Sequence, residues 1–596
     1  MKIKYLNGHR FLNSIIAGAM EVFRRKEFLD KINYFPVADN DTGTNIAITF
    51  RKIIDRISNH KTERIDESSR LLADLALESA QGNSGVIFAQ YFYGFSKEIG
   101  NEVKITTEKF GEAVRNAVNY AYKALSNPRE GTILSVMREW SEYVHSQSKK
   151  IKDFSVLITN SVNIARKSLA STKEKLEVLR KRNVVDSGAM GFVCFLEGIV
   201  NFIKFGSVKE IKVVESDSIK IDKEEPEYSN QEEPQFRWCT ECILKGQKLN
   251  VNNIRKTIEG FGDSVVVAGG NSKLRIHIHT DVPHIVVRLL KEYGEIVHQK
   301  ADDMLMQYRI AHTSHPSVAV VVDSGCDIPG ELIEKYMINT VPVKVILDET
   351  VFLDRVTITP SFLYEMLDKK IDYPTTSQPS PSDFKNLYSF LLKHYESIIS
   401  IHLPDKLSGT YQNALKAASD FPDGKIIVID SGLASAGIGH LAITAAELAW
   451  SGKSCEEIAQ TVEKMKKQTQ LFVYIDTLKY LTRSGRISPM KGLLARFINV
   501  KPILKFDEEG GLEITDKAFS KERGLKKLLN CVQNFARNRK ISRATVIHFA
   551  SKETGERVKT SIEKSLNIPN ISVLLATPAL GVHAGRGAVG VAITWG

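Results

Sequence analysis

Two carboxylates one residue apart, Asp39 and Asp41, offer the clearest chemistry in this sequence. Pro36 precedes them, which suits a loop that directs both carboxylates at one hard cation. Mg²⁺ prefers such oxygen ligands and shares them with substrate phosphates. Small residues follow at a predicted helix start, where free N–H groups favour anions: Thr42, Gly43, Thr44 and Asn45. The pattern predicts a metal and phosphate site, with an Asx turn and an N-cap residue as the alternative.

Three further loops place Gly beside short polar side chains, directly before predicted helices. They are residues 81–85 (QGNSG), 130–134 (EGTIL) and 186–189 (DSGA). Each is a candidate for cradling a phosphate at a helix N-terminus. No G-x-x-x-x-G-K-[ST] motif occurs in the chain, so a P-loop fold is excluded.

A metal-ligating set is indicated in the middle of the chain. The segment KLRIHIHT (273–280) places Arg275, His277 and His279 on one face of a predicted strand, because side chains alternate with period two. With Cys239 from WCTEC, the two imidazoles form a set suited to Zn²⁺. Cys242 would point to the opposite strand face and is optional. The alternative is a solvent-facing His pair beside an unrelated Cys.

Strand-to-loop junctions after residue 317 are rich in hydroxyl groups and Gly: residues 323–325, 375–380, 407–411, 430–432, 482–487 and 583–588. In α/β sheets, ligands bind outside the carboxyl ends of the strands. Donors without an evident base favour holding an anion over nucleophilic attack. A Ser-His-Asp hydrolase, with Ser408 or Ser324 as nucleophile and His583 as base, is the competing interpretation, but no G-x-S-x-G elbow is present.

The elements that position these groups fall into separate domains. With 596 residues, 43% of them hydrophobic, the chain predicts three or four folded units and excludes collagenous or wholly disordered classes. Helical periodicity dominates up to about residue 210, as in 71–80 and 107–125. Short β-branched runs alternate with helices downstream. We therefore predict an all-α domain (1–210), an acidic linker (211–235), a small α/β domain (236–313) and a large α/β domain (317–596).

Charge and cysteine content indicate which partners and which cellular compartment suit the chain. The net charge of +11 is spread along the chain, which favours a solvated surface and argues against nucleic-acid binding. Six Cys, of which only Cys239 and Cys242 are close together, fit a reducing cytoplasm. No run of about 18 apolar residues occurs, which argues against a membrane-spanning helix. The basic N-terminal segment predicts an amphipathic helix and not a secretory signal.

The first 200 residues resemble the nucleotide-binding (DhaL-like) domain of the dihydroxyacetone kinase family, in the form found in bacterial fatty acid kinases. The family pattern N-x-F-P-V-P-D-G-D-T-G-T-N, R-G-N-S-G, E-G-T-I-L and V-D-x-G recurs here in order. The resemblance implies an up-and-down helical barrel that holds ATP and Mg at one end. It implies that Asn33, Asp39 and Asp41 are metal ligands, the two carboxylates being catalytic.

The same resemblance implies a set of nucleotide-contacting residues: Thr42, Gly43, Thr44, Asn45, Asn83, Ser84, Gly85, Thr132 and Asp186. The sequence departs from the family pattern at Ala38 for Pro, Asn40 for Gly and Gln81 for Arg. The last change removes a phosphate-facing cation, which affects the expected turnover.

The fatty acid kinases also carry Y-C-T-E and H-x-H-T-D segments in a zinc-binding middle domain. This chain has C-T-E at 239–241 and H-I-H-T-D at 277–281. The resemblance implies that Cys239, His277 and His279 bind Zn. We expect a structural or regulatory role, because no neighbouring segment indicates a substrate pocket.

The last 280 residues resemble the DegV family of fatty-acid-binding proteins through D-S-x-x-D, T-S-Q-P-S, L-S-G-T-Y, L-K-Y-L-x-x-x-G-R-I and H-x-G-x-G-A motifs. The resemblance implies a two-lobed α/β domain in which an apolar tunnel holds an acyl chain. It implies that hydroxyl, Arg and His groups bind the carboxylate: Thr376, Ser377, Ser408, Arg486 and His583. Phe519 stands where the family has Arg, and Arg586 stands where Pro is usual.

Together the resemblances imply a cytoplasmic, ATP- and Mg-dependent kinase that converts a long-chain fatty acid, held by its own DegV-like domain, to an acyl phosphate. A homodimer and a peripheral membrane or lipid-transfer contact are compatible with this activity. Two alternatives stay open: a small polyol kinase of the dihydroxyacetone type, and a lipid-binding regulator with an impaired nucleotide site.

Overall fold

The computed structural model describes residues 2–34, 41–58, 60, 62–125, 128–205, 233–368, 373–486 and 500–596. The chain divides into two compact units. The first comprises residues 1–282 and 288–308, and the second comprises 283–287 and 309–596. Each unit is described by itself.

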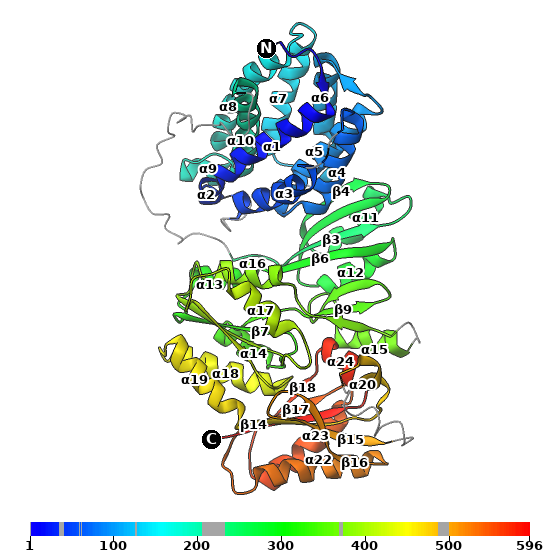
Figure 1. The fold of residues 1–596 in the computed structure, drawn as a ribbon, viewed down its shortest axis with the longest axis vertical. Coiled ribbons are helices and arrows are strands. Elements are labelled where there is room, and N and C mark those ends of the chain that lie inside the picture. The colour runs from blue at the N-terminus through cyan, green and yellow to red at the C-terminus, as the bar shows by residue number, and fades with distance from the viewer. Residues whose placement is uncertain are drawn as a thin grey trace. The chain divides into compact units, whose positions relative to one another are not determined.

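The N-terminal part of the first unit is helical (Figure 1). Its helices are α1 (Gly8–Arg24), α2 (Lys26–Lys31), α3 (Thr42–Ile57), α4 (Ile65–Ser79), α5 (Gly82–Ile99), α6 (Thr107–Ala124), α7 (Ile133–Ser148), α8 (Phe154–Lys175), α9 (Glu177–Arg182) and α10 (Ser187–Phe205). Two short strands, β1 (Leu6–Asn7) and β2 (Lys104–Ile105), pair antiparallel. The helices predicted over 71–80 and 107–125 are confirmed as α4 and α6.

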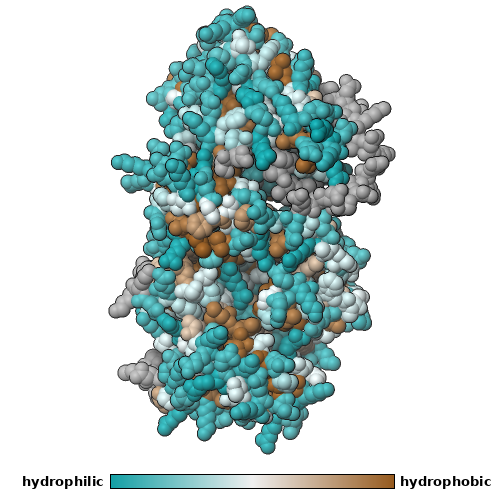
Figure 2. Space-filling view, turned by 180° about the vertical axis from the view of Figure 1, so that it is seen from behind, coloured by the Kyte–Doolittle hydropathy of each residue, from teal (hydrophilic) through white to brown (hydrophobic). Residues whose placement is uncertain are grey.

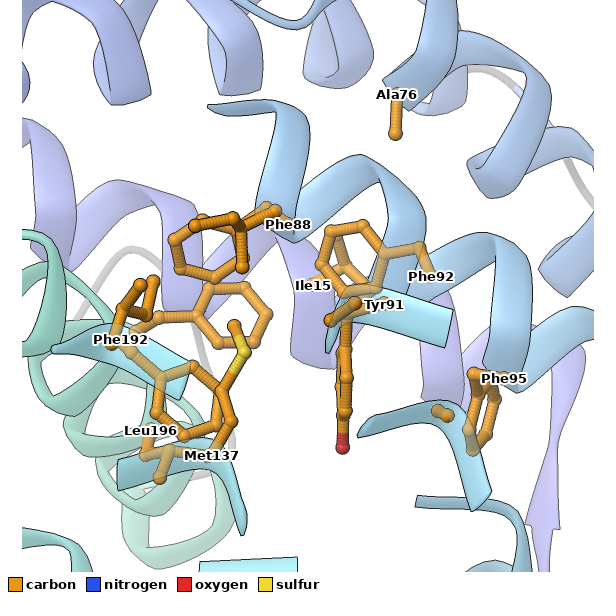
Figure 3. Close-up of a cluster of buried hydrophobic side chains, with 14 of the residues drawn as sticks. Ile15, Ala76, Phe88, Tyr91, Phe92, Phe95, Met137, Phe192 and Leu196 are labelled. Atoms are coloured by element: carbon orange, nitrogen blue, oxygen red, sulfur yellow. The ribbon is translucent and has the colours of Figure 1, made fainter. Parts of the chain in front are cut away.

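Aromatic side chains fill the interior of these helices. Figure 3 shows Phe88 and Phe92 of α5 in one apolar cluster with Phe192 of α10. Phe50 of α3 packs edge-on to Phe88, with ring centroids 5.2 Å apart, and stacks on Phe195 at the same distance. Such pairs add about 0.5–1.5 kcal/mol beyond the burial of their area. The cluster holds the helix N-termini described below in a fixed arrangement.

Helix α10 is long and apolar enough to cross a membrane by length and composition alone. In the structure 61% of its most apolar window is buried, and it packs against α1, α7 and α8. This arrangement is that of a core helix. The apolar-run criterion applied to the sequence did not single the segment out.

A four-stranded antiparallel sheet, ordered β4-β5-β3-β6, completes the first unit. Its strands are β3 (Trp238–Lys245), β4 (Asp263–Gly270), β5 (Lys273–Thr280) and β6 (Glu295–Asp303). The helical elements of this region are α11 (Val251–Ile258), η1 (Glu259–Phe261), α12 (Pro283–Lys291) and α13 (Met304–His312). Val266 and Ala268 of β4 belong to the same apolar core as the helices, and the Gly269 N–H donates to Oε1 of Gln90 at 2.7 Å. The sheet and α5 therefore share one core.

The second unit contains two main sheets and a smaller one. A parallel sheet ordered β13-β12-β7-β8 comprises β7 (Val318–Asp323), β8 (Asn339–Val341), β12 (Ser397–His402) and β13 (Ile426–Asp430). A six-stranded sheet ordered β16-β15-β14-β19-β17-β18 comprises β14 (Thr469–Tyr474), β15 (Lys501–Phe506), β16 (Leu512–Ala518), β17 (Ile541–His548), β18 (Ser572–Leu575) and β19 (Val589–Trp595). The small sheet comprises β9 (Lys344–Leu347), β10 (Thr350–Leu353) and β11 (Thr375–Ser377).

Helices cover these sheets: α14 (Gly330–Tyr336), α15 (Pro360–Asp368), α16 (Pro381–Leu391), α17 (Thr410–Ala418), α18 (Ala436–Trp450), α19 (Cys455–Lys466), α20 (Lys479–Ser484), α22 (Lys521–Ala536), α23 (Lys552–Leu566) and α24 (Pro578–Ala584). Helix α18 packs against strands of both main sheets and so joins the two lobes. Its buried His440 lies 2.7 Å from Oγ1 of Thr594 and 3.0 Å from Oγ1 of Thr545. The predicted architecture, a helical domain followed by small and two-lobed α/β domains, is confirmed.

On the face drawn in Figure 2, hydrophilic residues predominate and apolar residues form patches between them. Phe519, which stands where the DegV pattern has Arg, is 59% exposed. Arg586, which stands where Pro is usual, is exposed and pairs with Asp368 at 2.7 Å. Neither residue lines the pocket described below.

Candidate metal centre and ligand pocket

The loops that precede α3, α5, α7 and α10 converge in the helical domain. A Cβ atom built on Gly82 would lie 2.7 Å from Nδ2 of Asn45, and one built on Gly188 would lie 2.7 Å from Oγ of Ser84. Gly82 also has a φ of 62°, in the left-handed region that favours glycine. Four helix N-termini, each with N–H groups that favour anions, therefore lie together.

Asp186 links two of these helix starts. Its Oδ2 accepts the Ala189 N–H of α10 at 2.8 Å, and the Ile133 backbone N–H at the start of α7 also bonds to it. Burial raises the pKa of Asp186 to about 6, although both hydrogen bonds favour the charged form. The residue predicted to lie near the nucleotide thus fixes the geometry of the loops.

Some of the remaining predicted residues lie at these helix starts, and others lie outside the described residues. Asp41 and Thr132 are the N-cap residues of α3 and α7. The Thr132 hydroxyl donates to the Arg129 carbonyl at 2.8 Å. Oδ1 of Asn83 is buried without a hydrogen-bond partner among the described residues, which suits a ligand contact. Asp39, with Ala38 and Asn40, lies outside the described residues, and Asn33 is buried just before them.

Thr44 makes a contact that the sequence did not predict. Its backbone N–H donates to Oδ1 of Asp30 at 2.8 Å, and its hydroxyl donates to Oδ2 at 2.7 Å. The Thr44 side chain is therefore held by Asp30 of α2, and its predicted contact with the nucleotide stays a prediction. Asp30 fixes the start of α3 as an acidic N-terminal partner.

Cys239, His277 and His279 form a cluster whose ligand atoms all lie within 4.8 Å of one another. Strand pairing brings them together, because Cys239 lies opposite His279 and the next same-face residue, Glu241, lies opposite His277. Nε2 of His277 lies 3.2 Å from Nε2 of His279. Two nitrogens of a tetrahedral zinc site are separated by about 3.3 Å. His277 is 2% exposed, so the alternative of a solvent-facing His pair is wrong.

Both imidazoles face a carboxylate through the other ring nitrogen. Nδ1 of His277 lies 3.4 Å from Oε1 of Glu241, and Nδ1 of His279 lies 3.2 Å from Oδ1 of Asp263. Metal-ligating histidines characteristically donate their second N–H to a carboxylate. This arrangement leaves the two Nε2 atoms for the metal. The sulfur and two nitrogens fit zinc with one coordination position open, and buried Cys242 lies outside the cluster, as expected for the opposite strand face.

Glu241 was not singled out in the sequence, although period two places it on the Cys239 face. Its Oε2 accepts from Nη2 of Arg275 at 2.5 Å, and its Oε1 accepts the Gly82 N–H at 3.1 Å. Burial alone would raise the pKa of Glu241, but the Arg275 guanidinium and the His277 hydrogen bond outweigh it and hold the pKa well below its usual range. Through Glu241, the 81–85 loop that was predicted to cradle a phosphate is joined to the surroundings of the cluster.

Further charges surround this cluster. Burial raises the pKa of Cys239 well above its usual value, and the carboxylates of Glu241, Asp302 and Asp41 raise it further. Lys300 forms an ion pair with Asp302. A divalent cation would lower the Cys239 pKa again, because metal coordination requires the thiolate.

An apolar pocket lies in the second unit and has a cavity volume of about 120 Å³. Its wall is mainly aliphatic and aromatic: Val343, Leu403, Leu407, Leu471, Val473, Ile475, Leu481, Leu504, Phe506, Leu512, Ile547, Phe549 and Leu580. The predicted carboxylate-binding residues also line it: Thr376, Ser377, Ser408, Arg486 and His583.

Three of these polar residues bond to one another. Oγ1 of Thr376 lies 2.7 Å from Nε2 of His583, and Nη2 of Arg486 donates to the same hydroxyl at 3.3 Å. Arg486 also donates to the Leu407 carbonyl at 3.0 Å, which fixes its guanidinium. Burial, with the Arg486 charge, lowers the pKa of His583 to about 3. The three side chains thus form one hydrogen-bonded group, here called the clamp, at the wall of the apolar pocket.

The hydrolase alternative is not assembled in the described residues. Oγ of Ser408 lies 2.7 Å from Oγ1 of Thr410, and Oγ of Ser324 donates to Asp354 at 2.6 Å. His583 bonds to Thr376 and Arg486, not to either serine. Neither serine is therefore paired with His583 in the described residues.

Comparison with known protein families divides the chain into three parts. The DAK2 domain model matches residues 36–201, the FakA-like middle domain model of fatty acid kinases matches 235–310, and the DegV family model matches 317–595. The predicted fusion of these parts in one chain is confirmed.

Among curated proteins, an uncharacterised protein of Staphylococcus aureus strain USA300 is 31% identical over 331 residues, covering 54% of this chain. An uncharacterised protein of strain NCTC 8325 matches with the same values. The chain spans 60% of the length of these relatives.

Solved structures similar to the chain include two DegV proteins, both 29% identical to it. One, from Thermus thermophilus and described as binding fatty acid, covers 47% of this chain and 99% of its own, with a TM-score of 0.45. The other, from Bacillus subtilis and described as a fatty-acid-binding protein, covers 47% and 100%, with a TM-score of 0.44.

Proposed function

We propose that this chain, in which a DAK2 domain, a FakA-like middle domain and a DegV domain follow one another, is a cytoplasmic fatty acid kinase. It would use ATP and Mg²⁺ to phosphorylate a long-chain fatty acid held in its own DegV domain. The observation that carries the proposal is the Thr376–Arg486–His583 clamp on an apolar pocket. Such a site favours a ligand with one carboxylate and a long apolar tail.

The proposed reaction is a direct phosphoryl transfer. A carboxylate oxygen of the fatty acid attacks the γ-phosphorus of ATP and forms a new P–O bond. The bond from that phosphorus to the β,γ-bridging oxygen breaks, and ADP leaves with the electron pair. The attacking carboxylate carries no proton at neutral pH, so no general base is required. This agrees with chemistry that depends on positioning and charge.

The first unit would hold the nucleotide. The converging loops of α3, α5, α7 and α10 supply N–H groups for phosphate oxygens, and the partly buried side-chain amide of Asn83 lies among them. Asp39 and Asp41 are the residues that would hold Mg²⁺, which when bound neutralises charge on the transferred phosphate. Cys239, His277 and His279 would hold Zn²⁺, which adds a fixed positive charge beside the 81–85 loop.

The test is to purify the chain, identify the co-purified lipid by mass spectrometry, and trap acyl phosphate as the hydroxamate after adding Mg-ATP. Fatty acid with ATP-dependent hydroxamate is the expected result. Turnover of dihydroxyacetone without bound lipid would favour the polyol kinase. Lipid without turnover would favour the regulator, the candidate supported by Gln81 in the position of a phosphate-facing Arg.

The same assay distinguishes transfer within one chain from transfer between two chains of a dimer. One variant carries Asp39→Ala and Asp41→Ala, and the other carries Arg486→Met. Each alone is expected to be inactive. Activity restored on mixing indicates transfer between chains, whereas a mixture that stays inactive indicates transfer within one chain, where tethering raises the effective concentration of the two halves.

A further inference from the structure

The carboxylate of Glu241 lies between the metal cluster and the start of α5. One oxygen, Oε1, faces Nδ1 of His277 at 3.4 Å and accepts the Gly82 N–H at 3.1 Å. The other oxygen is held by Arg275 at 2.5 Å. Glu241 and Arg275 are only 2% and 3% exposed, so the carboxylate depends on these protein groups and not on water for its hydrogen bonds.

The start of α5 lacks a cap of its own. Gln81, its N-cap residue, makes no side-chain cap hydrogen bond, and Gly82 has no side chain. The first N–H groups of this 18-residue helix therefore depend on an outside acceptor. Glu241, which follows 159 residues later and lies in another domain, provides it. The conformation of the 81–85 loop therefore depends on the position of the Glu241 side chain on β3.

We propose that Glu241 is a positioning residue that couples metal occupancy at Cys239, His277 and His279 to nucleotide binding at the 81–85 loop. The inference rests on the proposed function, because it takes that loop as the phosphate site. A metal on Nε2 of His277 orients the ring so that Nδ1–H points at Glu241. The oriented carboxylate then holds the Gly82 N–H, and with it the following loop residues Asn83 and Ser84, in the position that receives a phosphate.

Asp263 offers a matched control. It faces Nδ1 of His279 at 3.2 Å, as Glu241 faces His277, but within the described residues it makes no hydrogen bond to the 81–85 loop. Loss of either carboxylate should weaken metal binding about 10–100-fold. Only loss of Glu241 should also abolish the coupling between metal binding and nucleotide binding.

The experiment measures the affinity of Mg-ADP by calorimetry for the full chain, with zinc loaded and with zinc removed. Wild type, Glu241→Gln and Asp263→Asn are compared. In wild type, zinc removal should weaken Mg-ADP binding at least fivefold, and Mg-ADP should tighten zinc binding by the same factor, because linkage is reciprocal. Zinc-loaded Asp263→Asn should keep this factor. Glu241→Gln should bind Mg-ADP equally with and without zinc.

Several results would overturn the proposal. Glu241→Gln could retain the wild-type coupling factor, wild type could show no coupling, or Glu241→Gln could bind Mg-ADP more tightly in both metal states. The last outcome would mean that the carboxylate competes with phosphate as an anion. Failure of zinc-loaded wild type to bind Mg-ADP would overturn the proposed function as well, whereas the other outcomes leave the kinase proposal standing.

Hydrogen exchange of the wild-type chain provides a measurement that does not depend on the folding of a variant. Zinc removal should speed exchange of the Gly82 amide, while the Gly269 amide, which bonds to Gln90 across the same domain contact, should change little. Equal acceleration at both amides would show general loosening of the domain contact and would contradict a specific role for Glu241.

Discussion

Nη1 of Arg486 lies 3.3 Å from Nδ1 of His583, and this contact determines where the protons of the Thr376–Arg486–His583 clamp lie. A guanidinium can only donate, so Nδ1 of His583 accepts and the neutral ring carries its proton on Nε2. That Nε2–H donates to Oγ1 of Thr376, which also accepts from Nη2 of Arg486. The Thr376 hydroxyl proton is left for another acceptor, which in the proposed function is the fatty acid carboxylate.

Replacing Thr376 by Val should therefore weaken fatty acid binding. The variant keeps the shape of the side chain but loses the donor to a charged carboxylate, a bond worth about 1.5–3 kcal/mol, or roughly 10–100-fold in affinity. Displacement of a fluorescent fatty acid measures the effect. Thr376→Ser retains the hydroxyl and should bind nearly as well as wild type. Equal losses in the two variants would mean that packing of the methyl group, and not the hydroxyl proton, decides the affinity.

His583 should make the second unit less stable in acid. Its pKa is lowered to about 3 in the fold from about 6.5 when unfolded, so the unfolded chain binds more protons between these values. Stability is fully present above pH 6.5 and is lost as the pH falls toward 3. Between pH 7 and pH 5 this group should remove about 2 kcal/mol of the free energy of unfolding.

The check compares wild type with His583→Gln by urea unfolding at pH 7 and pH 5. Both chains carry Trp140→Phe and Trp238→Phe, so that only the tryptophans of the second unit, Trp450 and Trp595, report. Buried His440 titrates in both proteins and cancels in the difference. An identical pH dependence in the two proteins would rule out His583 as a source of acid sensitivity.

Local signals predicted the positions of the helix starts well. Gly and short polar residues before an apolar helix gave the beginnings of α3 and α5, because capping and φ preferences act within a few residues. Among the short β-branched runs, Pro342, a residue without an N–H, lies between β8 and β9, which belong to different sheets.

Contacts between domains were not predictable in the same way. The Glu241–Gly82 bond depends on how the β3–β6 sheet packs on α5, and no local pattern encodes that packing. The same holds for Asp30, which binds Thr44 from the preceding helix. One part of this contact could be predicted. Side chains alternate along β3, so Glu241 must lie on the same strand face as Cys239.

The metal assignment predicts opposite results for two neighbouring cysteines. Cys239→Ser should lose tightly bound zinc, because the thiolate is one of three protein ligands, and zinc retained after dialysis should fall at least tenfold. Cys242→Ala should retain about one zinc per chain, since its side chain is buried on the other strand face. Plasma mass spectrometry measures the content. Zinc loss in Cys242→Ala with retention in Cys239→Ser would reverse the assignment.

If the carboxylate pair before α3 holds Mg²⁺, its loss should disrupt the nucleotide site and leave the fatty acid site intact. Asp39→Ala with Asp41→Ala should weaken Mg-ATP binding at least 100-fold, because the cation loses both anionic ligands, yet the chain should still co-purify with fatty acid. Calorimetry and lipid mass spectrometry measure the two sites separately. Asp41 is also the N-cap residue of α3, so fraying of this helix is a competing cause. Asp41→Asn keeps a good cap without the charge, and it should still lose much of the Mg-ATP affinity. Full affinity in Asp41→Asn would assign the effect to the helix, and full turnover in the double variant would refute the metal assignment.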